Sequence, residues 1–103
     1  MRDELLLAPE AVQGFGSLPA HERAEVRDAL ERHVRSEPTR VSKSRIKRLR
    51  GLRQPQYRLR VGEVRVFYDV TSEVVEVLAI VTKAEAAAWL TEYGTPDAPR
   101  SPG

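Results

Sequence analysis

The sequence predicts a single α+β domain, in which a small, mostly antiparallel sheet packs against an N-terminal helical hairpin and is followed by a C-terminal helix. Three observations lead to this prediction: an alternating strand, turn, strand pattern over residues 57–68, a nearly unbroken apolar run over 74–81, and apolar residues at helical spacing over 19–36. With 103 residues, 41% of them hydrophobic, the chain has enough apolar material for one modest core. We expect the domain to span residues 1–93 and the Gly-, Pro- and Ser-rich residues 94–103 to form a disordered tail.

The N-terminal third predicts one strand and two helices. The short apolar run 4–8 is closed by Pro9, as expected for a first strand, and residues 9–16 follow as a short helix. A stronger helix covers 19–36, with apolar residues on one side and alternating Glu and Arg on the other. It ends before Pro38, because proline disfavours the helical conformation in the residue that precedes it.

Residues 57–68 predict a β-hairpin around the two-residue turn Gly62-Glu63, since glycine in the first position suits a type II′ turn. The length of the loop fixes the register. The expected pairs are Val61 with Val64, Arg60 with Arg65, Leu59 with Val66, Arg58 with Phe67, and Tyr57 with Tyr68. One face of the hairpin is then apolar, and the other gathers three arginines and Phe67.

The C-terminal part predicts a strand and a helix. Residues 73–82 are rich in β-branched side chains, as is typical of a strand covered on both faces. Residues 83–92 are Ala-rich and helical, with Trp89 and Leu90 as the side chains that would dock this helix on the sheet. The predicted order is therefore strand, helix, helix, strand, strand, strand, helix.

The charges of the chain are strongly divided. Residues 40–65 contain ten of the seventeen Lys and Arg residues and one acid, Glu63, so this stretch carries a net charge of +9 and the remainder −7. A basic stretch of this kind is often only a solvated face. Three arginines on one side of a hairpin also repel one another, however, unless solvent screens them or an anion binds between them. The division of charge therefore favours a polyanionic partner.

The segment 43–53 leads into the hairpin. Its apolar residues Ile46, Leu49 and Leu52 recur at intervals of three. This spacing favours a short helical turn that is anchored to the core and presents its lysines and arginines outward, where they can contact a phosphate backbone.

Composition excludes several classes of protein. The chain has no cysteine and hence no disulfide framework or thiolate metal site, and we expect it in the cytoplasm. The run Leu5-Leu6-Leu7 is too short for a signal sequence, and no segment is long and apolar enough to cross a membrane. The two histidines, His21 and His33, lie in the second helix without a cluster of carboxylates, so we expect neither a metal nor another cofactor.

Residues 49–80 carry a resemblance to a known family. The sequence Leu-Arg-Gly-Leu at 49–52, the hairpin at 57–68 and the apolar strand at 74–80 resemble the RelE/ParE superfamily of toxins from bacterial toxin–antitoxin systems. The resemblance extends over about residues 4–92, although before residue 40 it lies only in the order of the elements. It implies a toxin that acts on the translation machinery or on DNA gyrase and that an acidic, partly disordered antitoxin holds inactive.

The RelE-like branch of this superfamily cuts messenger RNA in the ribosomal A site, and its working residues can be carried over by position. Arg58 and Arg60 stand where that branch has two basic strand residues, and Arg65 stands where it has the arginine that contacts the scissile phosphate. Lys83 falls near a further arginine of the branch and Trp89 near its tyrosine, so both positions hold a different residue type here.

Other side chains are candidates for nucleic-acid contacts. In a RelE-like protein the basic segment before the hairpin would hold ribosomal RNA phosphates, and it supplies Lys43, Arg45, Lys47, Arg48, Arg50 and Arg53. Phe67 is either covered by the C-terminal helix or exposed as a platform for a base, and Trp89 either docks its helix or stacks on a base.

Cleavage by this set of residues lacks an obvious proton acceptor. Attack of a ribose 2′-hydroxyl on its 3′-phosphate requires a base, stabilisation of the developing charge and a donor for the leaving oxygen. Arg60 and Arg65 can stabilise charge, but arginine stays protonated, and Lys83 acts as a base only if neighbouring arginines depress its pKa.

Three hypotheses follow from the sequence. The first is a RelE-like messenger RNA endonuclease, and the second is a ParE-like gyrase inhibitor that binds without catalysing a reaction. The third is a protein of the same fold that has lost toxicity and binds only nucleic acid or an antitoxin.

Overall fold

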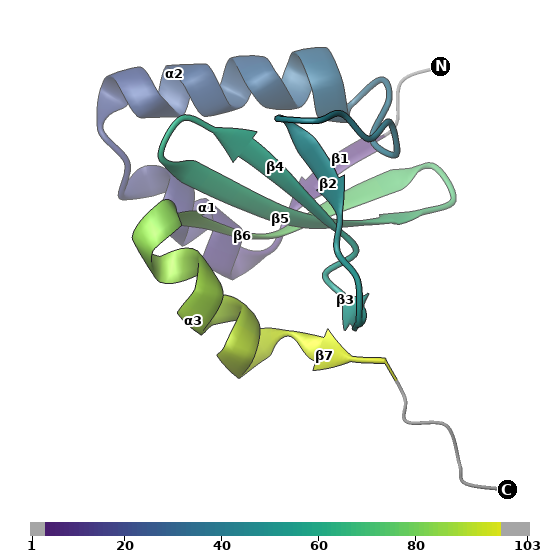
Figure 1. Ribbon diagram of the computed structural model, residues 1–103. Coiled ribbons are helices and arrows are strands. Elements are labelled where there is room, and N and C mark those ends of the chain that lie inside the picture. The colour runs from purple at the N-terminus through teal and green to yellow at the C-terminus, as the bar shows by residue number, and fades with distance from the viewer. Residues whose placement is uncertain (1–3, 98–103) are drawn as a thin grey trace, which may run out of the picture.

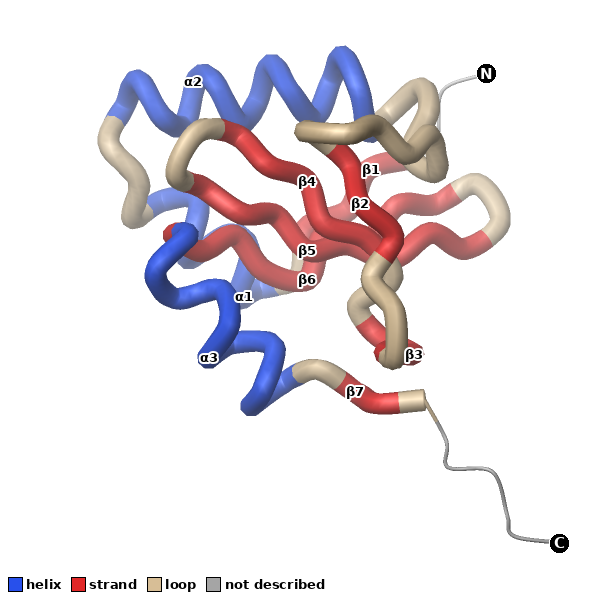
Figure 2. The backbone as a smooth tube through the Cα atoms, in the orientation of Figure 1, coloured by secondary structure: helices blue, strands red, loops and turns tan. Residues whose placement is uncertain are grey.

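The computed structural model describes residues 4–97 and has the predicted α+β architecture (Figure 1, Figure 2). Eleven elements follow one another along the chain: β1 (Glu4–Leu7), α1 (Pro9–Gly16), α2 (Ala20–Ala29), the π-helical turn η1 (Leu30–Val34), β2 (Ile46–Arg48), β3 (Leu52–Gln54), β4 (Tyr57–Val61), β5 (Val64–Thr71), β6 (Val74–Thr82), α3 (Lys83–Tyr93) and β7 (Thr95–Pro96). Among the helices formed by these residues, none is both long and apolar enough to span a bilayer.

The main sheet has the order β1-β6-β5-β4-β2, with β1 parallel to β6 and all other neighbours antiparallel. The β4–β5 hairpin has the register that the sequence predicts, from Val61 opposite Val64 to Tyr57 opposite Tyr68. Gly62 has a φ of +57°, while Glu63 is not among the residues with positive φ, as a type II′ turn requires.

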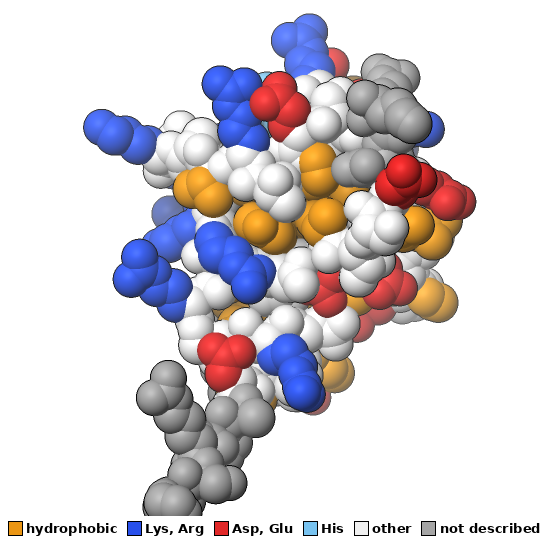
Figure 3. Space-filling model, turned by 90° about the vertical axis from the view of Figure 1, so that its right-hand side faces the viewer, with side chains coloured by type: hydrophobic (Ala, Val, Ile, Leu, Met, Phe, Trp, Pro, Cys, Tyr) orange, Lys and Arg blue, Asp and Glu red, His pale blue; other side chains and the backbone are white. Residues whose placement is uncertain are grey.

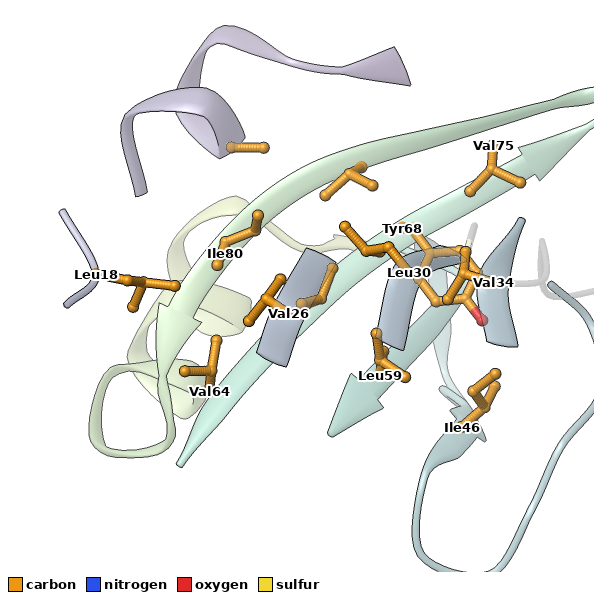
Figure 4. Packing of buried hydrophobic residues seen from close by; sticks show 13 residues of the cluster. Leu18, Val26, Leu30, Val34, Ile46, Leu59, Val64, Tyr68, Val75 and Ile80 are labelled. Carbon is orange, nitrogen blue, oxygen red and sulfur yellow. The ribbon is translucent and has the colours of Figure 1, made fainter. Parts of the chain in front are cut away.

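The sheet is covered on both faces. On one face, α1, α2 and η1 cover the main core, in which Leu59, Val66 and Tyr68 of the sheet are fully buried (Figure 4). On the opposite face, α3 covers a smaller cluster built on Phe67, Ala79 and Trp89. These two layers of helices leave part of the second face, over β4 and β2, without a helix (Figure 1).

The helical hairpin approaches the sheet closely at Gly14. A Cβ atom added to Gly14 would lie 2.2 Å from the carbonyl oxygen of Ile80, so α1 reaches its position against β6 only with glycine at this point. At the other end of the helical layer, the Tyr68 hydroxyl donates to the Pro38 carbonyl at 2.6 Å and ties the loop after η1 to the sheet.

Two expectations for the segment around residue 50 and for the tail are wrong. Residues 43–53 do not form a helical turn, because Ile46–Arg48 pairs with β4 and Leu52–Gln54 forms a second small sheet with Thr95–Pro96. The beginning of the expected disordered tail is therefore paired backbone, and Asp97 donates its N–H to Gly51 at 3.1 Å. The rest of that tail, 98–103, lies outside the described residues.

A buried carboxylate anchors the segment that connects the two sheets. Asp69 accepts hydrogen bonds from the Gln54 side chain at 2.6 Å and from the Gln56 backbone at 2.7 Å. The Gln56 side chain in turn accepts from the Val70 backbone at 2.9 Å. Because these groups satisfy one another, the chain between β3 and β4 is held against β5.

Candidate nucleic-acid interface

Four basic side chains share the face of the sheet that the N-terminal helices leave free. Arg58 is paired with Lys47 of β2 on one side and with Phe67 of β5 on the other, and Arg60 is paired with Arg65. Residues directly opposite in a sheet point to the same side. We call Lys47, Arg58, Arg60 and Arg65 the basic face.

The basic face has no counter-charge of its own. Within residues 4–97, none of its four side chains forms an ion pair with a carboxylate. Ion pairs join Arg32 to Asp28, Arg35 to Glu31 and Arg40 to Glu37, in the helical layer and the loop that follows it. Figure 3 shows Lys and Arg side chains gathered along one edge of the molecule, with most of the Asp and Glu side chains in that view toward the other edge.

Arg58 lies at the centre of this face. Its side chain is half-buried, and its Nε atom is buried without a hydrogen-bond partner among the described residues. Burial lowers the pKa of Arg58, and the charges of Arg65 and Arg60 lower it further. Because each of these effects disfavours the charged guanidinium, an anion placed between the arginines would be strongly attracted.

Arg65 is less accessible than the sequence suggests. Only 7% of its surface is exposed, and its guanidinium donates to the carbonyl oxygens of Gly62 at 2.8 Å and of Val64 at 3.1 Å. Part of its donor capacity therefore holds the hairpin turn. Arg60, which is exposed, and Arg58 are the members of the hairpin set that a ligand can approach more easily.

Lys83 stands beside the same turn. It is the first residue of α3, and its backbone N–H donates to the Glu63 carbonyl at 2.7 Å. Thr82 and Glu85 form a capping box around it: the Thr82 hydroxyl accepts from the Glu85 backbone, and the Glu85 carboxylate accepts from Thr82. The hydrogen bonds that the Glu85 carboxylate accepts from the Thr82 hydroxyl and from the Thr82 N–H lower the pKa of this carboxyl. The capping box fixes the start of the helix, and the Lys83 side chain stays exposed.

Phe67 and Trp89 lie in the contact between the sheet and α3. Phe67 has no exposed surface, and its ring stacks on that of Trp89 with centroids 5.0 Å apart and planes 6° apart. The Trp89 indole N–H donates to Glu10 at 2.9 Å. Both aromatic rings are thus used to dock α3, which is the alternative that the sequence left open.

The remaining basic candidates come from several different elements. Lys43, Arg50 and Arg53 are exposed in three different places, namely the loop before β2, the turn after it and strand β3. The guanidinium of Arg48 lies over the Tyr57 ring, 5.1 Å from its centroid, on the opposite side of the sheet from Lys47. Arg45 lines a hollow beside η1.

The positions of Lys47 and Tyr93 could not be predicted from the sequence. Lys47 joins the basic face only because residues 46–48 form a strand, which the interval of three between apolar residues concealed. Tyr93 is 53% exposed at the end of α3, with its ring 5.6 Å from Trp89, and the charge of Glu92 raises its pKa. Its place in the last turn of the C-terminal helix was the available signal.

The chemistry of the basic face is that of an anion-binding surface. It supplies guanidinium and ammonium groups that can hold a phosphate and stabilise negative charge. It contains no carboxylate or imidazole, and the two histidines belong to the helical layer on the other side, at His21 and His33. In the described range no three His, Cys, Asp or Glu side chains are placed to hold a metal ion.

Comparison with known proteins gives structural likeness only. No family model and no curated protein sequence matches the chain. The chain is similar to a mutant of the Escherichia coli toxin RelE in the free state, with 25% sequence identity and a TM-score of 0.67, over 89% of this chain and 94% of that one. It is also similar to a chain of the archaeal RelE–RelB complex from Pyrococcus horikoshii, with 28% identity and a TM-score of 0.59, over 81% and 97%. A third similar chain belongs to the RelB–RelE antitoxin–toxin complex from Methanococcus jannaschii, with 20% identity and a TM-score of 0.66, over 82% and 96%.

Proposed function

We propose that this chain, whose fold is similar to that of the RelE toxins, is the toxin of a toxin–antitoxin pair and that it cleaves messenger RNA on the ribosome. The observation that carries the proposal is the basic face itself. Lys47, Arg58 and Arg60 lie on one side of the sheet and, within the described residues, pair with no carboxylate. An RNA backbone supplies the missing negative charge.

The reaction we propose is the attack of a ribose 2′-oxygen on the adjacent 3′-phosphorus. The new 2′-oxygen–phosphorus bond forms as the bond to the leaving 5′-oxygen breaks, and one proton leaves the 2′-hydroxyl while another reaches the 5′-oxygen. Arg58 and Arg60 stabilise the extra negative charge on the phosphorus oxygens. Arg65 holds the turn that sets their spacing, and Lys83 at that turn is the residue we assign to proton transfer.

With this set of residues we expect slow cleavage, whose rate depends mainly on the orientation of the bound RNA. Arginine cannot accept a proton at neutral pH, and Trp89 has no group that transfers one. A bound ribosome would hold the 2′-oxygen in line with the leaving 5′-oxygen. Orientation of this kind can by itself lower the activation barrier by several kcal/mol, about 7–11 in the best cases. We therefore propose cleavage of ribosome-bound message and no cleavage of free RNA.

The antitoxin partner follows from the same surface. Two of the similar structures are complexes of a RelE chain with RelB, and an acidic chain would complement the basic face of this protein. Such a partner would exclude RNA by occupying the same guanidinium groups. We expect the rate of association to fall as salt rises, because screening removes the long-range attraction beyond about 8 Å at physiological ionic strength.

A translation extract tests the proposed reaction. Purified protein should produce cuts in a reporter message at codon spacing, mapped by primer extension, and Arg60→Ala should abolish them. Arg27→Gln, which removes one charge from the exposed face of α2, is the matched control and should cut normally. Intact message with the wild-type protein, at protein concentrations that saturate the ribosomes, would refute the nuclease.

A second candidate function is inhibition of DNA gyrase by binding alone. It is favoured by the absence of an imidazole or carboxylate on the basic face and by the burial of Trp89. In that case, the protein should inhibit supercoiling and trap cleaved DNA on gyrase while leaving messages intact. Unchanged supercoiling at micromolar protein would remove this candidate.

A further inference from the structure

A basic hollow of about 300 Å³ lies between η1 and the loop that leads into β2. Its lining joins the end of the helical layer to the beginning of the edge strand and consists of Arg32, His33, Glu37, Arg40, Ser42, Arg45 and Ile46. Three arginines face one acid in this set. This volume is at the lower end of the range for small-molecule pockets. It accommodates a phosphate group together with its waters.

The charges in this hollow are only partly compensated. Arg40 pairs with Glu37 at 3.0 Å, and Arg32 pairs with Asp28 at 3.1 Å. The guanidinium of Arg45 forms no hydrogen bond or ion pair within residues 4–97. It is therefore the lining charge that is available to a ligand.

The loop that carries Arg45 is held in place by hydrogen bonds to Ser42. The Ser42 hydroxyl accepts from the N–H groups of Arg45 and Ile46, both at 3.1 Å, and the Ser42 N–H donates to the Ile46 carbonyl at 2.9 Å. Ile46 is buried in the main core, and the Tyr68 hydroxyl fixes Pro38 at the other end of the loop. The hollow is thus a formed feature, which lowers the entropic cost of binding a ligand.

His33 forms the opposite wall of the hollow. It lies in the π-helical turn η1, a rare irregularity that is frequent at functional sites. Partial burial lowers the pKa of His33, the charges of Arg45 and Arg32 lower it further, and Asp28 opposes them. The charged groups around the imidazole are Asp28 and Arg32 from the helical layer and Glu37, Arg40 and Arg45 from the loop.

We infer that this hollow binds a phosphate group of an RNA strand that also crosses the basic face. The hollow borders the basic face along the backbone, since the backbone N–H of Arg60 in β4 donates at 2.8 Å to the backbone carbonyl of Arg45, the residue just before β2. Arginine and imidazole N–H groups together suit a tetrahedral phosphate, because the guanidinium fork can donate two parallel hydrogen bonds. The choice of RNA as the source of the phosphate rests on the proposed function. The hollow itself does not.

An NMR titration of the two histidines tests the inference. The pKa of His33 is measured from its ring-proton shifts in the wild-type protein, alone, with inorganic phosphate, and with an oligoribonucleotide that carries 2′-O-methyl groups and cannot be cut. A bound anion favours the imidazolium, so both additions should raise the pKa of His33. His21, exposed on α2 outside the hollow, supplies the reference signal.

Matched variants locate the effect. Arg45→Gln should weaken binding of the oligonucleotide by on the order of tenfold and remove the response of His33, since a charge-assisted hydrogen bond is lost. Arg27→Gln, equal in charge but outside the hollow, should behave like the wild type. Superposable amide spectra outside residues 32–46 establish that Arg45→Gln is folded.

The outcomes separate this inference from the proposed function. A His33 that responds to phosphate and RNA supports the hollow even if no message is cut in the extract. A His33 that ignores both anions, while the extract shows codon-spaced cuts, overturns the hollow and leaves the nuclease standing. A larger response to a polyglutamate peptide than to the oligonucleotide would overturn the choice of RNA.

Discussion

The rings of Phe67 and Trp89 stack almost in parallel, with centroids 5.0 Å apart, and this contact joins α3 to the face of the sheet that also carries the arginines. Phe67 occupies the same face as Arg58, its direct neighbour across the hairpin. The stack therefore sets where the apolar part of this face ends and where the basic part begins.

Replacing the tryptophan tests the importance of that stack. Trp89→Ala should lower the free energy of unfolding by about 3–5 kcal/mol, because a large buried side chain leaves a cavity against Phe67. Tyr93→Ala, whose ring is mostly exposed at the end of the same helix, should cost about 1 kcal/mol or less. Urea unfolding measures both losses. It is followed by far-UV circular dichroism, because Trp89 is the only tryptophan and its replacement removes the fluorescence signal. Equal losses would show that α3 is not docked through Trp89.

The two glycines of α1 should respond in opposite directions to alanine. Gly14→Ala places a Cβ atom 2.2 Å from the Ile80 carbonyl oxygen and should destabilise the protein by about 1–3 kcal/mol, because the backbone of α1 or β6 must move. Gly16→Ala meets no atom within 4 Å and should be neutral or stabilising by up to about 1 kcal/mol. Thermal unfolding of the pair compares them, and a stable Gly14→Ala protein would contradict the close approach of helix and strand.

The buried Tyr68 should make stability fall in alkaline solution. Burial raises the pKa of Tyr68, and the nearby Tyr57 raises it further. The unfolded chain therefore loses this proton from about pH 10 upward while the folded protein keeps it, and the free energy of unfolding decreases as the pH rises. Urea unfolding between pH 8 and 11 measures this slope. In Tyr68→Phe the slope above pH 10 should be shallower.

The same substitution also removes a hydrogen bond at neutral pH. Tyr68→Phe leaves the Pro38 carbonyl without its donor and should cost about 1–3 kcal/mol. Identical stability and an identical alkaline slope in the two proteins would show that the hydroxyl is not buried against this carbonyl.

The sequence predicts the hairpin and its arginines well because the rules involved are local. A two-residue turn fixes the register of its strands, so Arg60 faces Arg65 and Arg58 faces Phe67 as expected. The parts that local rules miss depend on distant segments. Residues 46–48 form a strand because they pair with the edge of β4. Thr95 forms a strand because it pairs with Leu52–Gln54. The environment of Phe67 likewise depends on a helix that begins sixteen residues later.

The site is less predictable than the fold for the same reason. Arg65 is placed on the correct strand by its position, but its burial and its bonds to Gly62 and Val64 arise from how the turn folds back. The hollow around Arg45 and His33 joins two segments whose contact no sequence pattern indicates. Charge counting finds the basic stretch, but not which of its side chains share the face of the sheet with Arg58.

The most direct test of the central claim is the salt dependence of RNA binding by the basic face. The affinity for an uncleavable 2′-O-methyl oligoribonucleotide is measured at several salt concentrations for the wild type, for the Arg58→Gln, Arg60→Gln double variant, and for Arg27→Gln. Each lost phosphate contact on a single strand should flatten the plot of log affinity against log salt by about 0.7, so the double variant should lose about 1.4 in slope. Arg27→Gln should keep the wild-type slope. A double variant with the same slope and affinity as Arg27→Gln would contradict the account.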